Sequence, residues 1–293
     1  MDMKSGLVTI VGRPNVGKST LLNALIGEKI SIISDRPQTT RKNILGVLTR
    51  DDMQVMFLDT PGIHKPKDNL GEYMVKNAIS ALEDDVDLVL FMVDATEITD
   101  EDVYIDRYIL PKYNTKKILV INKCDLVHGD PVENIKEKID INKYNEIVPV
   151  SALYRTNLDK LEELIKKYLP EGPQYYPEDT KTTEPIEDRI REIIREKVIL
   201  LTYQEIPYSV AVALEEFYEK ENVFYIRAII FVEKDSQKGI VIGKDGRKLK
   251  EIGTLAREEL EAFLGKKVYL DLWVKVKEKW RKKSRWVEEL VYS

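Results

Sequence analysis

Short apolar runs alternate with amphipathic stretches through the first 170 residues of the chain. Each apolar run is rich in β-branched residues and ends at a polar or glycine-containing cluster, which is typical of a buried strand. Because parallel strands need long crossover connections, this alternation predicts an α/β domain with a mostly parallel sheet and helices on both faces. The predicted strands are 7–11, 44–49, 53–58, 86–93, 117–121 and 147–150, and the predicted helices are 19–26, 72–83, 100–110, 132–142 and 157–168.

The pattern changes after a proline-rich stretch. Residues 170–185 hold four prolines and little apolar content, which indicates an interdomain linker. We therefore predict a first domain at 1–170, a linker at 171–185 and a second domain at 186–293. The order helix, strand, strand, helix, helix, strand makes the second domain a smaller α+β domain. Its predicted elements are a helix at 187–201, strands at 208–217, 223–233 and 267–277, helices on either side of 243–246, and a basic, helix-like end from residue 280.

Composition excludes several classes of protein. The 293 residues are too many for one ordinary domain and fit two. One cysteine and two histidines argue against a disulfide scaffold and a zinc site, and the cysteine usage suggests a reducing compartment. No apolar run approaches the length of about 18 residues that a membrane span needs, and the N-terminus does not have the pattern of a signal peptide. We expect a soluble, cytoplasmic-type protein.

Charge is distributed unevenly along the chain. The net charge is −5, but residues 1–180 carry −7 and residues 181–293 carry +2. Within 234–285 there are 16 basic and 8 acidic side chains. Because phosphate contact needs only local positive charge, the second domain remains a candidate for binding nucleic acid.

Residues 12–19 match the phosphate-binding pattern G-x-x-x-x-G-K-[ST], and they lie between a predicted strand and a predicted helix. Glycines allow backbone N–H groups to surround phosphates, and the helix N-terminus adds positive potential. We expect Lys18 to reach the β and γ phosphates and the Ser19 hydroxyl to bind Mg²⁺. The candidate phosphate-binding residues are Gly12, Arg13, Pro14, Asn15, Val16, Gly17, Lys18, Ser19 and Thr20.

A second polar cluster, Asp59-Thr60-Pro61-Gly62, follows the predicted strand 53–58. A carboxylate at the end of a strand can hold the Mg²⁺ shell through water, which is the role we predict for Asp59. The N–H group of Gly62 can bond the γ-phosphate and so respond to its hydrolysis.

Two further clusters predict selection of guanine. Asn122-Lys123-Cys124-Asp125 follows strand 117–121, and the Asp125 carboxylate can accept from the N1–H and the 2-amino group of guanine. Adenine lacks that pair of donors, so it would leave the carboxylate unpaired. Asn122 and Lys123 would brace the base and its loop. Ser151-Ala152-Leu153 follows strand 147–150 and can present a backbone N–H to the guanine O6.

These motifs, in this order, resemble the translation-factor-like GTPases. Gln38-Thr39-Thr40-Arg41 resembles their switch I, which implies Thr40 as a Mg²⁺ ligand when GTP is bound. The candidate catalytic residues are therefore Lys18, Thr40 and Gly62.

The position after Gly62 departs from the Ras type. Many GTPases of that type place a water-orienting Gln there, but this chain has Ile63, which cannot hydrogen-bond water. His64 comes next, although a histidine after a mobile switch is more often solvated than catalytic. In related GTPases an Asn at the position of Asn15 holds K⁺ against the phosphates; the alternative is that Asn15 only bonds its own loop.

The second domain contains a G-x-x-G turn within Val-Ile-Gly-Lys-Asp-Gly, which resembles a KH domain of the prokaryotic type. Such a turn lets a nucleic-acid backbone come close, while preceding apolar residues can line a groove for bases. Trp273 and Trp280 lie among basic residues and could stack on bases. However, the alternation at 270–277 favours Trp273 in the core, and the charges at 281–285 could form a plain solvated face. The candidate RNA-binding residues are Gly243, Lys244, Asp245, Gly246, Arg247, Lys248, Lys250, Arg281 and Lys282.

A GTPase domain of this type followed by one KH domain resembles the Era family of bacterial ribosome-associated GTPases. That resemblance implies GTP/GDP and Mg²⁺ as ligands and K⁺ as a further possibility. It also implies a monomer that binds the 3′ end of 16S ribosomal RNA, acts in maturation of the small (30S) ribosomal subunit, and associates peripherally with the inner face of the membrane. Two other classes stay open at this point. They are an RNA-binding module with a degenerate nucleotide site and a nucleotide-dependent metabolic kinase, and binding of guanine nucleotide would separate them.

Overall fold

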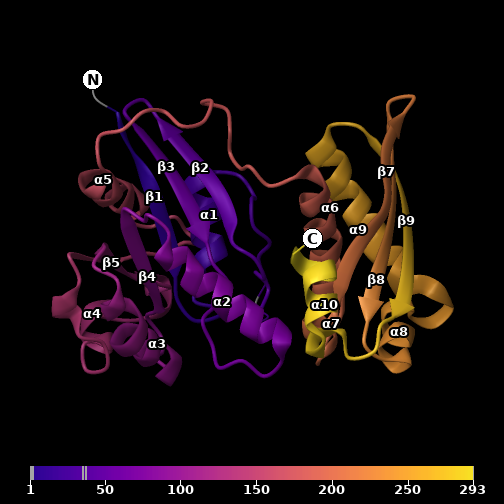
Figure 1. The fold of residues 1–293 in the computed structure, drawn as a ribbon, viewed down its shortest axis with the longest axis horizontal. Coiled ribbons are helices and arrows are strands. Elements are labelled where there is room, and N and C mark those ends of the chain that lie inside the picture. The colour runs from indigo at the N-terminus through magenta and orange to yellow at the C-terminus, as the bar shows by residue number, and fades with distance from the viewer. Residues whose placement is uncertain (1–2, 35, 37, 293) are drawn as a thin grey trace. The chain divides into compact units, whose positions relative to one another are not determined.

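The computed structural model describes residues 3–34, 36 and 38–292. The chain divides into two compact units (Figure 1). The first unit comprises 1–33, 40–67 and 71–183. The second comprises 34–39, 68–70 and 184–293, so two short segments of the N-terminal half belong with it.

The first unit is built on a six-stranded sheet with the strand order β2-β3-β1-β4-β5-β6. Only the β2–β3 pairing is antiparallel, which confirms the predicted mostly parallel sheet. β4 and most of β5 are fully buried, as strands covered on both faces must be. The strands are β1 (Lys4–Val11), β2 (Ile44–Arg50), β3 (Met53–Asp59), β4 (Leu88–Asp94), β5 (Lys116–Asn122) and β6 (Glu146–Pro149).

Helices cover both faces of this sheet. Leu21 of α1 and Leu161 of α5 pack with one set of strand side chains, whereas Ala78 of α2 and Ile105 after α3 pack with the other set around Phe91. These two apolar cores hold the strand ends, and therefore the loops that follow them, in fixed positions. The helices are α1 (Lys18–Ile26), α2 (Asn69–Glu83), α3 (Asp100–Tyr104), α4 (Pro131–Ile135) and α5 (Leu158–Tyr168).

Two predicted helices are shorter than expected. The predicted helix 132–142 ends as α-helix at Ile135, and a separate 3-10 turn at Ile141–Lys143 begins after Asp140, which accepts a bond from the Asn142 N–H. A separate turn, capped by the Asp140 side chain, therefore stands where the last part of the predicted helix was expected. The predicted helix 100–110 continues beyond Tyr104 only as a π-turn and a 3-10 turn, because Pro111 cannot continue the α-helical hydrogen bonding.

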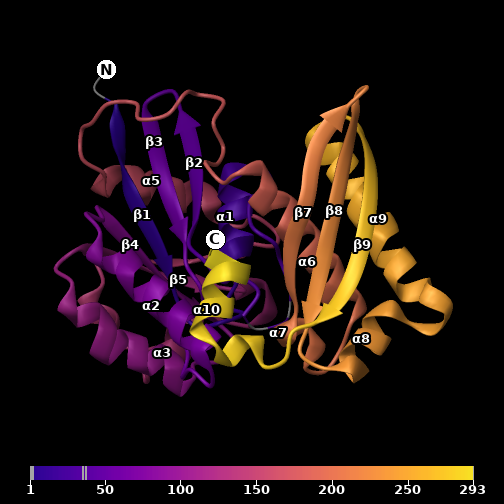
Figure 2. The ribbon, with the colours of Figure 1, turned by 45° about the vertical axis from the view of Figure 1, so that its right-hand side comes forward.

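The second unit has a three-stranded sheet in the order β7-β8-β9, with β7 and β8 antiparallel and β8 and β9 parallel. Helices α6, α8 and α9 pack against this sheet around Ile226, Ala228 and Ile230 of the central strand (Figure 2). The elements are α6 (Ile186–Leu201), α7 (Ile206–Ser209), β7 (Ala211–Lys220), β8 (Val223–Val232), α8 (Asp235–Ile242), α9 (Arg247–Leu264), β9 (Lys267–Val276) and α10 (Ser284–Val287).

The first strand of the second unit begins later than predicted, at Ala211 rather than residue 208. Pro207 occupies the first turn of α7, where its missing N–H has no cost, so these residues form a helical turn instead. Among the described residues, no helix has the length and apolar character needed to cross a membrane.

Candidate nucleotide site and nucleic-acid groove

The predicted nucleotide motifs meet at one edge of the first sheet. β1 pairs in parallel with β3 and β4, and β5 pairs in parallel with β4 and β6. The carboxyl ends of these strands therefore point the same way and place the loops that follow them side by side. Ligands of open α/β sheets bind at this edge.

The phosphate loop surrounds Lys18. Gly17 has a φ of 100° and lies so close to Asn122 that a Cβ would be 2.3 Å from its amide nitrogen, so only glycine fits there. The Lys18 Nζ donates to the Gly12 and Arg13 carbonyls at 3.1 and 2.9 Å. Burial lowers the pKa of Lys18 to about 8. This ammonium lies at the opening of α1, beside Ser19 and Thr20, where the N-terminus of a helix favours bound anions.

Three oxygen-bearing side chains meet beside Lys18. The Ser19 Oγ donates to Asp59 Oδ2 at 2.6 Å and lies 2.8 Å from Thr40 Oγ1. Asp59 is fully buried, which raises its pKa, and its Oδ1 atom has no hydrogen-bond partner among the residues that the structure describes. A buried carboxylate oxygen without a partner, next to two hydroxyls, fits a hard cation such as Mg²⁺. Thr40, the predicted switch-I ligand, lies at this cluster.

The D-x-x-G turn packs directly on the phosphate loop. A Cβ on Gly62 would lie 2.5 Å from the Pro14 nitrogen, and the Ile63 N–H donates to the Gly12 carbonyl at 3.1 Å. Thr60 donates to the Ile10 carbonyl at 2.7 Å. Ile63 itself is 1% exposed, so its side chain belongs to the core and not to the reaction site.

Asn122 joins three loops of the predicted guanine site. Its Nδ2 donates to the Val16 carbonyl at 2.8 Å, and its Oδ1 accepts from the Ala152 N–H at 2.9 Å. Ser151 is buried beside it, Leu153 is exposed, and Asp125 is also exposed at the turn that follows β5. The Asp125 carboxylate is therefore accessible to a nucleotide base, and Asn122 fixes the loops around this carboxylate.

Two carboxylates that the sequence analysis did not identify hold the basic residues of this site. Asp94, at the end of β4, lies 2.6 Å from Lys123 Nζ. Burial alone would raise the pKa of Asp94, but bonds from Lys123 and Thr96 outweigh burial and lower it. Asp102 is fully buried and accepts from the Arg13 Nε at 2.8 Å. A sequence signal for Asp102 exists, because Thr99 and Asp102 form a capping box at the start of α3.

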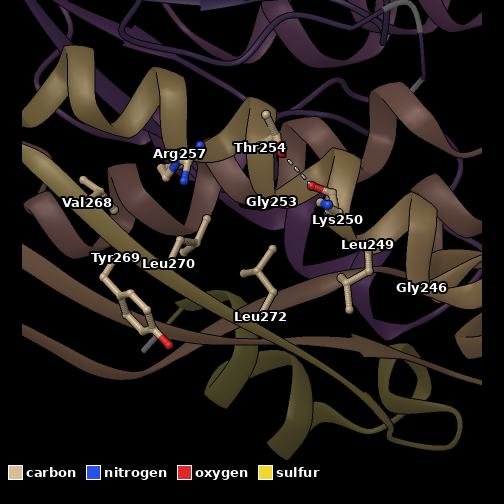
Figure 3. Close-up of a pocket in the computed structure, with 10 residues that line it drawn as sticks. All are labelled: Gly246, Leu249, Lys250, Gly253, Thr254, Arg257, Val268, Tyr269, Leu270 and Leu272. Atoms are coloured by element: carbon tan, nitrogen blue, oxygen red, sulfur yellow. Dashed lines mark hydrogen bonds between the residues drawn. The ribbon is translucent and has the colours of Figure 1, made fainter.

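The second unit has a groove between α9 and β9, with a volume of about 520 Å³ (Figure 3). Leu270 and Leu272 of β9 give it an apolar floor, and Lys250 and Arg257 of α9 are exposed along its rim. The G-x-x-G turn lies at one end, where Gly246 has a φ of 74° and its Cα faces open space. Apolar floor, basic rim and an open glycine turn are the features that bind single-stranded RNA in KH domains.

The structure separates the predicted RNA-binding residues into two groups. Gly246 and Lys250 line the groove, and Gly243, Lys244, Asp245, Arg247 and Lys248 belong to the turn or to the start of α9. Arg281 and Lys282 lie in a separate 3-10 turn, where Arg281 pairs with Glu233 at 2.8 Å. Neither of these two lines the groove described here.

The expectations for the tryptophans are wrong. Trp280 is fully buried and donates to the Ser209 carbonyl at 2.8 Å, so it cannot stack on a base. Trp273 is 55% exposed rather than buried in the core. The register of β9 explains the second error, because Val274 faces the helices and Trp273 therefore faces the opposite side.

Comparison with known proteins agrees with both halves of the chain. Residues 7–123 match the family model described as 50S ribosome-binding GTPase, and residues 205–281 match that of the KH domain. The chain is 46% identical to Era in a crystal structure with MgGDPNP and nucleotides 1506–1542 of 16S ribosomal RNA, with a TM-score of 0.94 and 99% of each chain covered. The chain belongs to the Era family. A variant of Aquifex aeolicus Era bound to GDP and AlF₄⁻ is 45% identical over 99% of this chain and 100% of that one, also with a TM-score of 0.94.

Membership of the Era family confirms the predicted combination of a GTPase domain and a KH domain. It also excludes the alternative of a nucleotide-dependent metabolic kinase, because such a kinase would leave the KH domain unexplained. The degenerate nucleotide site is disfavoured by the intact cluster of Lys18, Ser19, Asp59 and Thr40 described above. The protein is therefore an Era-family GTPase.

Proposed function

We propose that this protein is a Mg²⁺-dependent GTPase switch that binds 16S ribosomal RNA near its 3′ end and assists maturation of the small ribosomal subunit. The observation that carries the nucleotide half is the meeting of the Ser19 and Thr40 hydroxyls beside Asp59, whose other carboxylate oxygen is buried and has no hydrogen-bond partner in the described part of the chain. The RNA half is supported by the groove beside Gly246 and by the similarity to an Era structure that contains that RNA.

The residues present fit both ligands. Ser19 and Thr40 would hold Mg²⁺ by their hydroxyls and Asp59 through water. Lys18 would neutralise charge on the β and γ phosphates. The N–H of Gly62 would bind the γ-phosphate, so the D-x-x-G turn would respond when that phosphate leaves. Mg²⁺ supplies neutralisation of the charge that develops between the two phosphates. Asp125 selects guanine through its two acceptor oxygens.

The proposal includes a second cation besides Mg²⁺, the monovalent ion K⁺. Asn15 is exposed in the phosphate loop with a φ of 64°, at the position where related GTPases hold K⁺. K⁺ there would act like an arginine finger. Single-turnover hydrolysis should then be faster in K⁺ than in Na⁺, and Asn15→Ala should remove the difference without weakening GTP binding. Equal rates in the two salts would eliminate the K⁺ role and leave the GTPase assignment intact.

The RNA half is tested by the G-x-x-G turn. Gly246→Asp introduces a negative side chain into open space, and Asp tolerates the positive φ better than most residues. We expect this variant, alone or with Lys244→Asp, to lose affinity for nucleotides 1506–1542 of 16S ribosomal RNA and to keep its GTP affinity. If RNA affinity and its salt dependence stayed unchanged, the RNA-binding function would be wrong.

The resemblance carries three further parts of the proposal: a monomer, a cytoplasmic location and peripheral association with the inner face of the membrane. Fractionation of cells followed by a salt wash tests the last of these. Peripheral association predicts a membrane-bound fraction that salt releases, and a purely soluble protein would contradict it.

A further inference from the structure

The sheet of the second unit carries three tyrosines in a row across its exposed face. Tyr218 of β7 lies opposite Tyr225 of β8, and Tyr225 lies opposite Tyr269 of β9. The rings of Tyr218 and Tyr225 are stacked, with centroids 5.3 Å apart and planes 7° apart. Tyr225 and Tyr269 follow at 5.6 Å and 38°. Each ring supports the next, so the row is a preformed set of aromatic faces; we name these three residues the tyrosine ladder.

The tyrosine ladder lies on the side of the sheet that the helices leave uncovered. Strand residues alternate between faces, and Val268 and Leu270 beside Tyr269 belong to the helix-facing core. Tyr269 is 60% exposed and Tyr218 is 48% exposed. A single exposed ring is common on protein surfaces, but three adjacent rings form a contiguous patch of the kind that marks interaction sites.

Tyr269 connects the ladder to the RNA groove. It lies on the edge strand β9, and it also lines the groove between α9 and β9. Figure 3 shows it at the end of the groove opposite Gly246, near Val268 and Arg257. An RNA strand that enters at the G-x-x-G turn and follows the groove therefore leaves it beside the Tyr269 ring.

Charge on this face favours stacking rather than phosphate attraction. Arg227 bonds Glu216 at 2.7 Å and Asp271 at 3.0 Å, and Lys275 bonds Glu215 at 3.1 Å. These basic groups are balanced by carboxylates on the same face. This face therefore presents aromatic rings, rather than free positive charge, to a nucleic acid. Stacking of bases on such rings tolerates any sequence, because every base has a π-face.

We propose that the tyrosine ladder is a second RNA subsite: the base that follows the nucleotides held in the KH groove stacks on the outer face of Tyr269, backed by Tyr225 and Tyr218. The groove of a KH domain holds about four nucleotides. The ladder extends the footprint beyond them and gives longer single strands an advantage over a tetranucleotide. This inference rests on the proposed RNA-binding function and names a part of the surface outside the groove.

The test compares RNA of two lengths. Labelled oligomers of four and ten nucleotides, tiled across nucleotides 1506–1542 of 16S ribosomal RNA, are titrated with the full chain and with Tyr269→Ala. Removing one stacked base costs about 1–3 kcal/mol, so the affinity for the best ten-nucleotide RNA should fall by roughly 5- to 150-fold. Because Tyr269 also lines the groove, affinity for the best tetranucleotide should fall as well, but much less than affinity for the ten-nucleotide RNA. The salt dependence of binding should stay the same, because no phosphate contact is lost.

Three variants make the result specific. Tyr269→Phe keeps the ring and should bind like the parent, whereas Tyr269→Leu keeps apolar bulk without a ring and should bind like Tyr269→Ala. Tyr175→Ala removes a tyrosine of similar exposure, 57%, from the segment before α6 and should have no effect. A 2-aminopurine base placed next to the tetranucleotide core should be quenched on binding to the parent and not to Tyr269→Leu.

The outcomes separate this inference from the RNA-binding function. Unchanged affinity of Tyr269→Ala for the ten-nucleotide RNA would overturn the ladder subsite while the groove stands, and would leave the ladder as a surface for another partner. An equal loss for both lengths would mean that the substitution damages the groove, and would also overturn it. If the parent bound neither RNA, the RNA-binding function itself would fail and the inference with it.

Discussion

The hydroxyls of Ser19 and Thr40 lie 2.8 Å apart, although the two residues are 21 positions apart in the chain. Ser19 lies in the first turn of α1, after the phosphate loop, whereas Thr40 comes from the segment that resembles switch I. Ser19 also donates to Asp59, which follows a third strand. One small cluster therefore joins three loops, and a cation bound there would link the position of switch I to the phosphates.

We expect Thr40→Val to raise the Mg²⁺ concentration needed for hydrolysis and to slow single-turnover GTP hydrolysis by about 10-fold or more. Valine keeps the shape of threonine and removes only the oxygen. GDP affinity should change little, because the γ-phosphate orders switch I. Hydrolysis rates measured across a Mg²⁺ titration check this.

The matched control for that variant is Thr39→Val. The Thr39 hydroxyl donates to the Arg36 carbonyl and does not reach Ser19. If Thr39→Val raised the Mg²⁺ requirement as much as Thr40→Val, the assignment of Thr40 as the ligand would be wrong.

Guanine selection should depend on Asp125. In Asp125→Asn the amide can donate to the 2-oxo group of xanthine and cannot accept from both guanine donors, so preference should move from GTP toward xanthosine triphosphate. Titration of both nucleotides against parent and variant measures the shift. An unchanged preference for GTP would contradict the assignment.

The stability of the nucleotide-free protein should depend on Lys18 and pH. Its pKa is lowered by burial from 10.5 to about 8, so between these values the unfolded chain binds more protons than the folded one. The burial penalty is present in full below pH 8 and disappears as pH rises toward 10.5, so the free energy of unfolding should gain up to roughly 3 kcal/mol from this group.

Urea unfolding of the parent and of Lys18→Met between pH 7 and 10 measures that effect as the difference between the two proteins. The parent should be the less stable of the two at pH 7 and should approach the variant at pH 10. Lys112→Met, at an exposed position, controls for general charge effects. A constant difference between parent and Lys18→Met across this range would contradict the prediction.

Glycine at position 253 should lower the stability of the protein while it keeps the groove open for RNA. It lies inside α9 and lines the groove, and a Cβ there would meet only a Leu272 methyl at 3.6 Å. Gly253→Ala should stabilise the protein by about 0.5–1 kcal/mol, because glycine is a poor helix former. Gly253→Leu should keep the fold but fill the groove and weaken RNA binding by about 10-fold.

The control for the glycine series is Ala262→Leu, at an exposed position of the same helix that does not line the groove. It should leave RNA affinity unchanged. Thermal unfolding and RNA titration of the three variants give both quantities. Undiminished RNA affinity in Gly253→Leu would mean that the bases do not lie in this groove.

The fold of the first unit could be predicted from sequence because its signals are local. Each buried strand is a continuous apolar run, and each is followed by a polar cluster that marks its end. The end of the helix after Pro131 could not be predicted from periodicity, because helix-like apolar spacing continues from Ile135 to Ile139, both of which are in the core, although the α-helix ends at Ile135. The late start of β7 depended on Pro207, whose preference for a first helical turn competed with an apolar strand pattern.

In the candidate sites, too, local motifs predict some residues, whereas others depend on contacts that form only in the fold. Lys18, Ser19, Asp59 and Asp125 could be placed at one edge because their motifs end parallel strands. The contact between Asp102 and Arg13 could not be predicted in this way, because it joins residues 89 positions apart. Trp273 shares a face with Asp271 and Lys275, so the alternation of β9 itself places its ring opposite Val274 and away from the helices. Trp280 lies outside β9, in the turn Trp280–Lys282, where the alternation carries no information.

We propose that this chain hydrolyses GTP, selected by Asp125, with Mg²⁺ held at Ser19, Thr40 and Asp59. The most direct test is single-turnover hydrolysis of GTP and ATP by the full chain, each with Mg²⁺ and with EDTA. We expect phosphate release from GTP with Mg²⁺, little from ATP, and none above background in EDTA. Equal hydrolysis of the two nucleotides, or GTP hydrolysis that persists in EDTA, would contradict it.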